Sequence, residues 1–232
     1  MTEQQHKKRF FWIYAMILLI LAPVFTKSML DYNETLTKEV VSVTLTKEQR
    51  EELLKEIREA SEEVKKRNDD KNSAYLKLGS AYERMGYRAK AVSAYKEVLE
   101  MDTMNVSALV SLASLQEKME QEEEAENSYK RLVEIQPNAR NYNLLAGFVL
   151  QRKNDVSSAR ALYLEGLQKT NSDTLLMKYF ASFLESIGDR YEAYLYWDAV
   201  YRRESSNTEV KNNVERLKVI EADVIKATEK VK

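Results

Sequence analysis

The sequence contains no cysteine and a single histidine, His6. Without cysteine there can be no disulfide, no thiolate zinc site and no cysteine nucleophile. One histidine in the N-terminal tail cannot build a histidine-based triad or a multi-histidine metal site. The sequence also shows no glycine-rich phosphate loop and no cluster of metal ligands. We therefore predict no catalytic residue, no cofactor and no metal, and we disfavour an enzyme.

Glycine and proline are also scarce, with 5 and 2 residues in 232. This is too few to supply the turns of a sheet protein of this length, so we predict an all-helical fold. A basic excess is missing as well, because 36 Lys and Arg face 37 Asp and Glu. Proteins that hold nucleic acid by charge usually carry such an excess, so we expect no nucleic-acid partner.

One long apolar run spans residues 10–25, with Arg9 directly before it and Lys27 after Thr26. Its length lies between a signal-peptide core of ~7–15 residues and a spanning helix of roughly 17–25. No A-x-A-like cleavage site follows it, and aromatic residues cluster at its start, as they do at membrane interfaces. We predict a transmembrane signal anchor at 10–26. A cleaved signal peptide and a buried core helix are the alternatives.

The basic residues of the tail set the expected orientation. Lys7, Lys8 and Arg9 directly precede the apolar run, and few basic residues follow it. The positive-inside rule then places the tail, residues 1–9, in the cytoplasm and the C-terminal part outside. We expect a single-pass protein of a bacterial inner membrane, with an extended spacer at 27–46, where Thr and Val are frequent.

A charged helix is predicted at 47–71, starting from a capping box of Thr46 and Gln49. A helix with one narrow apolar stripe packs on one side only, and a short coiled coil is the alternative. The stripe is predicted along Leu54, Ile57, Ser61 and Val64, with Leu53 and Ala60 beside it.

Between residues 72 and 207 the sequence repeats every 34 residues. A small residue recurs at Ala91, Ala125, Ala159 and Ala193. An aromatic residue follows four positions later, at Tyr95, Tyr129, Tyr163 and Trp197. Another small residue recurs earlier in each unit, at Gly79, Ala113, Gly147 and Ala181. Turn positions share a phase at Gly86, Glu120, Asn154 and Gly188. Each unit is explained as a helical hairpin: small residues allow close helix approach, and glycine at the turn supplies positive φ.

These columns resemble the tetratricopeptide repeat (TPR) family, whose signature fits Leu78, Gly79, Tyr82, Ala91 and Tyr95 in the first unit. The resemblance implies a helical-hairpin solenoid of four repeats, at 72–105, 106–139, 140–173 and 174–207. The third repeat departs most from the pattern, with Asn143 at the usual aromatic position. The carboxylate clamp of chaperone-binding TPR domains is absent.

Residues 208–232 are predicted to form a capping helix, which shields the last apolar face and begins at a capping box of Ser206 and Glu209. Its last two turns are expected to form a frayed, solvated end, and an overhang that docks a partner is the alternative. An acidic run from Glu117 to Glu126 is predicted to be a solvated turn, with a basic partner or a metal site as alternatives.

The resemblance also implies that the first helix of each repeat lines a concave groove for partner proteins. We expect this partner-binding groove to include Leu76, Ser80, Arg84, Val110, Ser114, Lys118, Leu144, Phe148, Arg152, Lys178 and Ser182. A large apolar residue among serines makes Phe148 the preferred anchor. Its packing between repeats is the alternative.

Taken together, the sequence predicts a membrane-anchored TPR adaptor. It would bind protein or peptide partners and assist envelope or secretion-complex assembly. Two alternatives stay open: a structural protein that self-assembles as a homo-oligomer, and an organelle receptor whose repeats face the cytosol.

Overall fold

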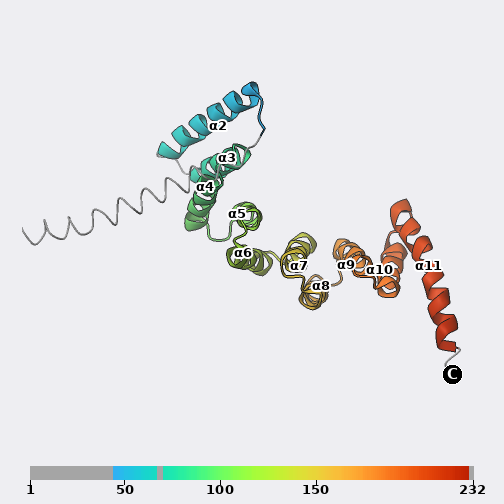
Figure 1. Cartoon of the computed structure of the whole chain (residues 1–232). Helices are drawn as coiled ribbons and strands as arrows, with labels where there is room; N and C mark the ends of the chain where they lie inside the picture. The colour runs from blue at the N-terminus through green and yellow to red at the C-terminus, as the bar shows by residue number, and fades with distance from the viewer. Residues whose placement is uncertain (1–43, 67–69, 230–232) are drawn as a thin grey trace, which may run out of the picture. The chain divides into compact units, whose positions relative to one another are not determined.

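The computed structural model describes residues 44–66 and 70–229, with side chains up to Lys218. Within these residues the chain forms ten α-helices and no strand (Figure 1), which confirms the all-helical prediction there. The predicted tail and anchor, and the spacer up to residue 43, lie outside the described residues. None of the described helices is both long and apolar enough to cross a bilayer. The chain divides into two compact units, residues 1–97 and 98–232.

The first unit contains α2 (Lys47–Lys65), α3 (Lys71–Arg84) and most of α4 (Arg88–Met101). The predicted capping box at the start of α2 is present. The Gln49 backbone N–H donates to Thr46 Oγ1 at 3.2 Å, and the Thr46 N–H donates to Gln49 Oε1 at 3.0 Å. The box thus supplies acceptors for two backbone N–H groups at the start of the helix, which the helix itself leaves without partners.

The predicted apolar stripe of α2 is displaced by one residue. Leu53 and Ala60 are buried, whereas Leu54 is 44% exposed. Leu53 packs in a cluster with Ala81 and Met85, with Ile57 at its edge. Residues 53, 57 and 60 follow the i, i+4, i+7 spacing of one helix face, so α3 covers that face and leaves Leu54 beside it.

Seven helices form the second unit together with the end of α4. They are α5 (Val106–Lys118), α6 (Glu122–Ile135), α7 (Ala139–Lys153), α8 (Val156–Lys169), α9 (Thr174–Ser186), α10 (Arg190–Arg203) and α11 (Thr208–Glu229). Consecutive helices pair as the hairpins α5–α6, α7–α8 and α9–α10. The small residues Ala125, Ala159 and Ala193 are each 0% exposed, so a larger side chain has no room at these helix contacts.

All four predicted turn positions adopt the left-handed conformation. Gly86 and Gly188 have φ of 80° and 84°, and Glu120 and Asn154 have φ of 59° and 51°. The first two confirm the expectation that glycine ends the helix with positive φ. Glu120 adopts the same backbone at a steric cost, because its Cβ crowds the following carbonyl.

The remaining glycines differ in their surroundings. An ideal Cβ on Gly79 would lie 2.6 Å from Tyr95 Cε1, and one on Gly166 would lie 2.6 Å from Tyr142 Cγ. At Gly147 the same atom would meet nothing within 4 Å. Two of the three positions therefore require glycine for close helix packing, and Gly147 does not.

The start of α11 corrects another prediction. The cap is Asn207 rather than Ser206, because Asn207 Oδ1 accepts the backbone N–H of Glu209 at 3.1 Å and that of Val210 at 3.3 Å. Asparagine serves this role as well as serine does, so the two cannot be separated by residue type alone.

Candidate partner-binding surfaces

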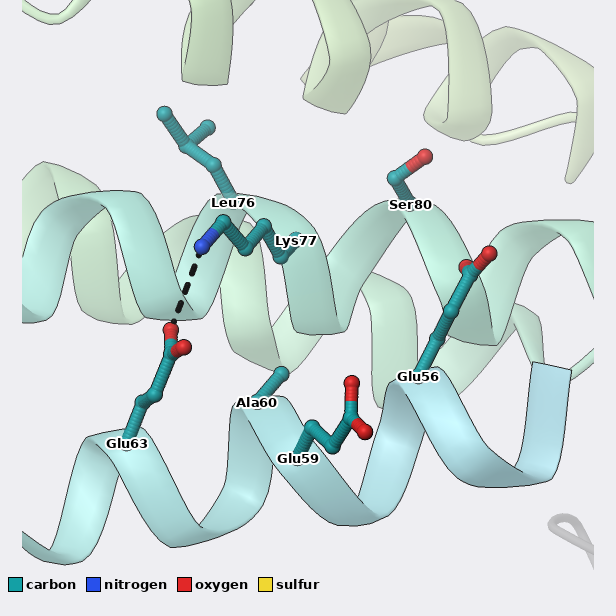
Figure 2. A pocket seen from close by; sticks show the side chains of 7 residues that line it. All are labelled: Glu56, Glu59, Ala60, Glu63, Leu76, Lys77 and Ser80. Atoms are coloured by element: carbon teal, nitrogen blue, oxygen red, sulfur yellow. Dashed lines mark hydrogen bonds and ion pairs between the residues drawn. The ribbon is translucent and has the colours of Figure 1, made fainter. Parts of the chain in front are cut away.

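One pocket lies between α2 and α3 in the first unit, with a volume of about 540 Å³. We call it the α2–α3 pocket (Figure 2). Its lining residues are Glu56, Glu59, Ala60, Glu63, Leu76, Lys77 and Ser80. Leu76 and Ser80 were predicted groove residues, and the structure brings them together here. The contribution of α2 was missed, because a capping helix was not expected to line a pocket.

Ion pairs cross between α2 and α3 beside this pocket. Lys77 Nζ lies 3.2 Å from Glu63 Oε2 (Figure 2), and Arg84 Nη1 lies 2.8 Å from Glu56 Oε2. The predicted groove residue Arg84 is thus engaged with α2. Because these side chains are well exposed, each pair contributes little stability, roughly 0–1 kcal/mol.

A larger pocket of about 710 Å³ is lined by the first helices of three successive hairpins in the second unit. We call it the first-helix pocket. It is lined by Val106, Ser107, Val110 and Ser111 of α5 and its start, by Gln136, Asn138, Ala139, Arg140 and Asn141 around the start of α7, and by Asp173 and Leu175 at α9. Of the predicted groove residues, only Val110 is among them.

The first-helix pocket has its own repeat column. Ser107, Asn141 and Leu175 are 34 residues apart and all line the pocket. The predicted column Val110, Leu144 and Lys178 begins three residues later, so the pocket lies about one turn closer to the helix starts. The period alone could have identified these residues, had the first turn of each helix been included.

The lining of this pocket combines polar and apolar groups. The Asn141 side chain is buried and is fixed by donating from Nδ2 to the Gln136 carbonyl at 2.8 Å. Leu175 is apolar yet 45% exposed, and Ser107 and Arg140 are exposed as well. Hydroxyl and guanidinium groups can bond to a peptide backbone while Leu175 contacts an apolar side chain, which is the usual composition of a ligand site.

The preferred anchor Phe148 does not face a ligand. It is 2% exposed, and its ring centroid lies 5.4 Å from that of Tyr129. Phe148 instead packs between repeats, which was the alternative interpretation. The predicted residues Ser114 and Leu144 are half-buried, Lys118 and Ser182 are exposed, and none of the four lines a pocket described here.

The two remaining basic candidates take part in ion pairs. Arg152 Nε lies 3.4 Å from Glu117 Oε1, and its Nη2 donates to the Glu117 carbonyl at 3.1 Å. Lys178 Nζ lies 2.6 Å from Glu204 Oε2, and this hydrogen bond lowers the pKa of Glu204. These cations tie helices together.

The repeated aromatic residues make a hydrogen bond that was not predicted. Tyr95 donates to Glu83 at 3.4 Å, and Tyr129 donates to Glu117 at 2.9 Å. Trp197 Nε1 likewise donates to Glu185 at 2.8 Å. Each acceptor precedes its donor by 12 residues. The glutamates of this column therefore hold the two helices of a hairpin together.

Burial and these bonds shift the ionisation of several groups. Burial raises the pKa of the Tyr129 hydroxyl, and its bond to the Glu117 carboxylate raises it further. Burial likewise raises the pKa of Tyr163 to about 12. Burial raises the pKa of Glu185, but hydrogen bonds from Arg216 and Trp197 outweigh it and leave that pKa below its usual value.

Comparison with known families identifies the repeat. The family model of the tetratricopeptide repeat matches residues 73–103 and 106–138. Comparison with curated proteins gives no match.

Solved structures share the fold at low identity. One described as MamA protein is 20% identical, covers 70% of this chain and 88% of its own, and has a TM-score of 0.51. A tetratricopeptide repeat protein from Parabacteroides merdae ATCC 43184 is 17% identical, with 78% and 71% covered and a TM-score of 0.54. MamA 41-end from Desulfovibrio magneticus RS-1 is 16% identical, with 68% and 89% covered and a TM-score of 0.50. At these identities the likeness concerns the fold alone.

Proposed function

From a chain whose residues 73–103 and 106–138 are tetratricopeptide repeats, we propose a membrane-anchored adaptor that binds protein or peptide partners. Its main site is the first-helix pocket. The observation that carries this proposal is the column Ser107, Asn141 and Leu175, which brings three successive hairpins to one pocket of about 710 Å³. This volume lies within the range of about 300–1,000 Å³ that is usual for ligand sites.

The expected ligand is an extended peptide segment. Consecutive first helices lie side by side in repeat proteins, so equivalent residues recur along the pocket and can meet successive residues of a peptide. Val110 and Leu175 favour an apolar ligand side chain, and exposed Ser107 and Arg140 favour its backbone carbonyls.

The anchor and its location are part of the same proposal. The uncharged run at 10–26 and the basic tail before it support a single span in a bacterial inner membrane, with the repeats on the outer side. Assistance in envelope or secretion-complex assembly is the role that we infer for that location. Protease added to spheroplasts should digest the repeats. Repeats that stay intact until the membrane is broken would rule out this topology.

A photo-crosslinking residue placed at Leu175 tests the binding site in living cells. Leu195 provides the matched control, since it is a leucine of similar exposure, 46% against 45%, and lies on α10 away from the pocket. We expect a discrete adduct from position 175 and none from 195. Equal adducts from both positions, or none from either, would reject the first-helix pocket as the site. An adduct of twice the chain mass would indicate self-assembly instead.

A further inference from the structure

A second hollow lies in the second unit, and it shares only α7 with the helices that line the first-helix pocket. It has a volume of about 440 Å³ and is lined by residues of α6, α7 and α8. We call it the α6–α8 groove. Its apolar part comprises Val133, Leu145 and Val149, which are buried, and the half-buried Leu162. It shares no lining residue with the first-helix pocket.

The repeat pattern explains why this groove is open. One repeat further along the chain, ion pairs join α8 to the start of α10. Arg160 of α8 pairs with Asp189 and Glu192, and its Nη2 lies 2.6 Å from Asp189 Oδ2. Thirty-four residues earlier, the place of Arg160 is taken by Glu126. The places of Asp189 and Glu192 are taken by Asp155 and Ser158.

A cation therefore joins α8 to α10, whereas at the corresponding positions α6 and α8 present Glu126 and Asp155. Two carboxylates cannot pair with each other, so no such ion pair forms between these helices. Glu126 and Ser158 instead line the groove that remains.

The rim of the groove is acidic. Glu126, Glu134 and Glu165 line it together with a single cation, Lys130. Glu123 is exposed and lies on the same face of α6, three residues before Glu126.

These carboxylates are not equally available. Glu126 is paired, since Lys130 Nζ lies 2.9 Å from its Oε1 and Lys153 also contacts it. Glu165 accepts the Tyr142 hydroxyl at 3.1 Å. Glu134 makes no ion pair with any residue that the structure describes, and it is exposed. Its charge is free to meet a ligand.

We propose that the α6–α8 groove docks a basic amphipathic helix of a partner protein. Ser158 and Glu165, the ends of the α8 wall, are seven residues apart, or about 10 Å along the helix. This length suits two turns of a ligand helix, whose apolar side chains at i and i+4 would contact Val149 and Leu162. Lysine or arginine on its flanks would face Glu134 and Glu123, the exposed carboxylates of the rim.

The test measures fluorescence anisotropy of a labelled peptide with the full chain in nonionic detergent. The probe is a short helical Ala/Lys peptide with two leucines four residues apart, and its twin carries Glu in place of each Lys. Two variants address the groove. Glu134→Lys reverses the free charge, and Ala161→Phe fills the groove from an exposed lining position. Their controls are Glu52→Lys and Leu195→Phe, which make the same kinds of change at exposed positions outside the groove.

We expect saturable binding of the Lys peptide that weakens as salt rises, and much weaker binding of the Glu peptide. Glu134→Lys should raise the Kd about fivefold, since one exposed attraction becomes a repulsion. Ala161→Phe should abolish binding, and both controls should match the unchanged chain. Equal affinity for the two peptides, no saturable binding, or equal losses in groove variants and controls would each overturn the proposal. The same anisotropy in every variant and in the unchanged chain, as partition of the peptide into detergent would give, would overturn it too.

Discussion

Gly147 and Gly166, the two glycines of the α7–α8 hairpin, should respond oppositely to alanine. Gly147 lies inside α7, and a Cβ there would meet nothing within 4 Å. Alanine is favoured over glycine in a helix interior by about 1 kcal/mol. With no steric cost to offset this gain, Gly147→Ala should stabilise the chain by about that amount. For a domain of this size the melting temperature should then rise by roughly 2–4 °C.

Gly166→Ala brings the same gain in helix propensity but meets two neighbours. The new Cβ would lie 2.6 Å from Tyr142 Cγ and 2.8 Å from Leu176 Cδ2. The Leu176 methyl can move, but Tyr142 is 1% exposed and its hydroxyl is bonded to Glu165. Overpacking of this kind costs typically 1–3 kcal/mol, so the net change should be a destabilisation of roughly 0–2 kcal/mol.

Urea unfolding of the full chain, followed by circular dichroism at 222 nm, separates the two effects. The midpoint should move up for Gly147→Ala and down for Gly166→Ala, with the m-value unchanged in both. A rise for Gly166→Ala would refute the packing of α8 against Tyr142 and Leu176. A drop for Gly147→Ala would show that the space beside α7 is filled.

Three further predictions concern the turns, the hairpin contacts and alkaline pH. Glu120→Gly should raise the free energy of unfolding by roughly 0.5–1 kcal/mol, because it relieves a left-handed backbone of φ 59°. Gly188→Ala serves as the control and should lower the urea midpoint. An unchanged midpoint in both variants would contradict the turn geometry. Ala125→Leu and Ala159→Leu should each cost roughly 1–3 kcal/mol in a urea titration, since both side chains are 0% exposed; tolerance of both would contradict the repeat register. The folded-state pKa values of Tyr142 and Tyr163 are raised to about 12, above the usual value of about 10. Their contribution to stability is therefore complete below pH 10 and is lost as the pH rises toward 12, so absorbance at 295 nm should show late tyrosinate formation together with unfolding.

The 34-residue period was enough to predict those features that require one residue type at one position in each hairpin. A small residue at Ala125, Ala159 or Ala193 can be recognised because nothing larger fits between two helices. The turn positions share their phase for the same reason, since each must adopt positive φ. Both requirements are local to a hairpin, so a single sequence with a regular period carries them.

Features that depend on contact between hairpins could not be predicted in this way. Gly166 has no counterpart in the glycine columns, and its need for glycine comes from Tyr142 of α7 and Leu176 of α9. Phe148 was assigned to the groove because its neighbours in the column are serines, but the ring lies against Tyr129 of the preceding hairpin. Tyr129 beside Phe148, and Leu176 beside Gly166, are neighbours defined by how hairpins stack, whereas Tyr142 lies in the same hairpin as Gly166.

In the third repeat, two departures from the repeat pattern compensate each other. Gln151 replaces the glutamate that accepts the aromatic hydrogen bond in the other repeats, so Tyr163 has no carboxylate acceptor at that position. Tyr163 instead donates to Asn143 Oδ1 at 2.7 Å, and Asn143 is the residue that stands where the family usually has an aromatic one. Because Tyr163 is buried, its hydroxyl would cost roughly 1–3 kcal/mol if left without a partner. The two departures of this repeat therefore belong together: the carboxylate acceptor lost at position 151 is replaced by an amide oxygen at position 143, within the same hairpin.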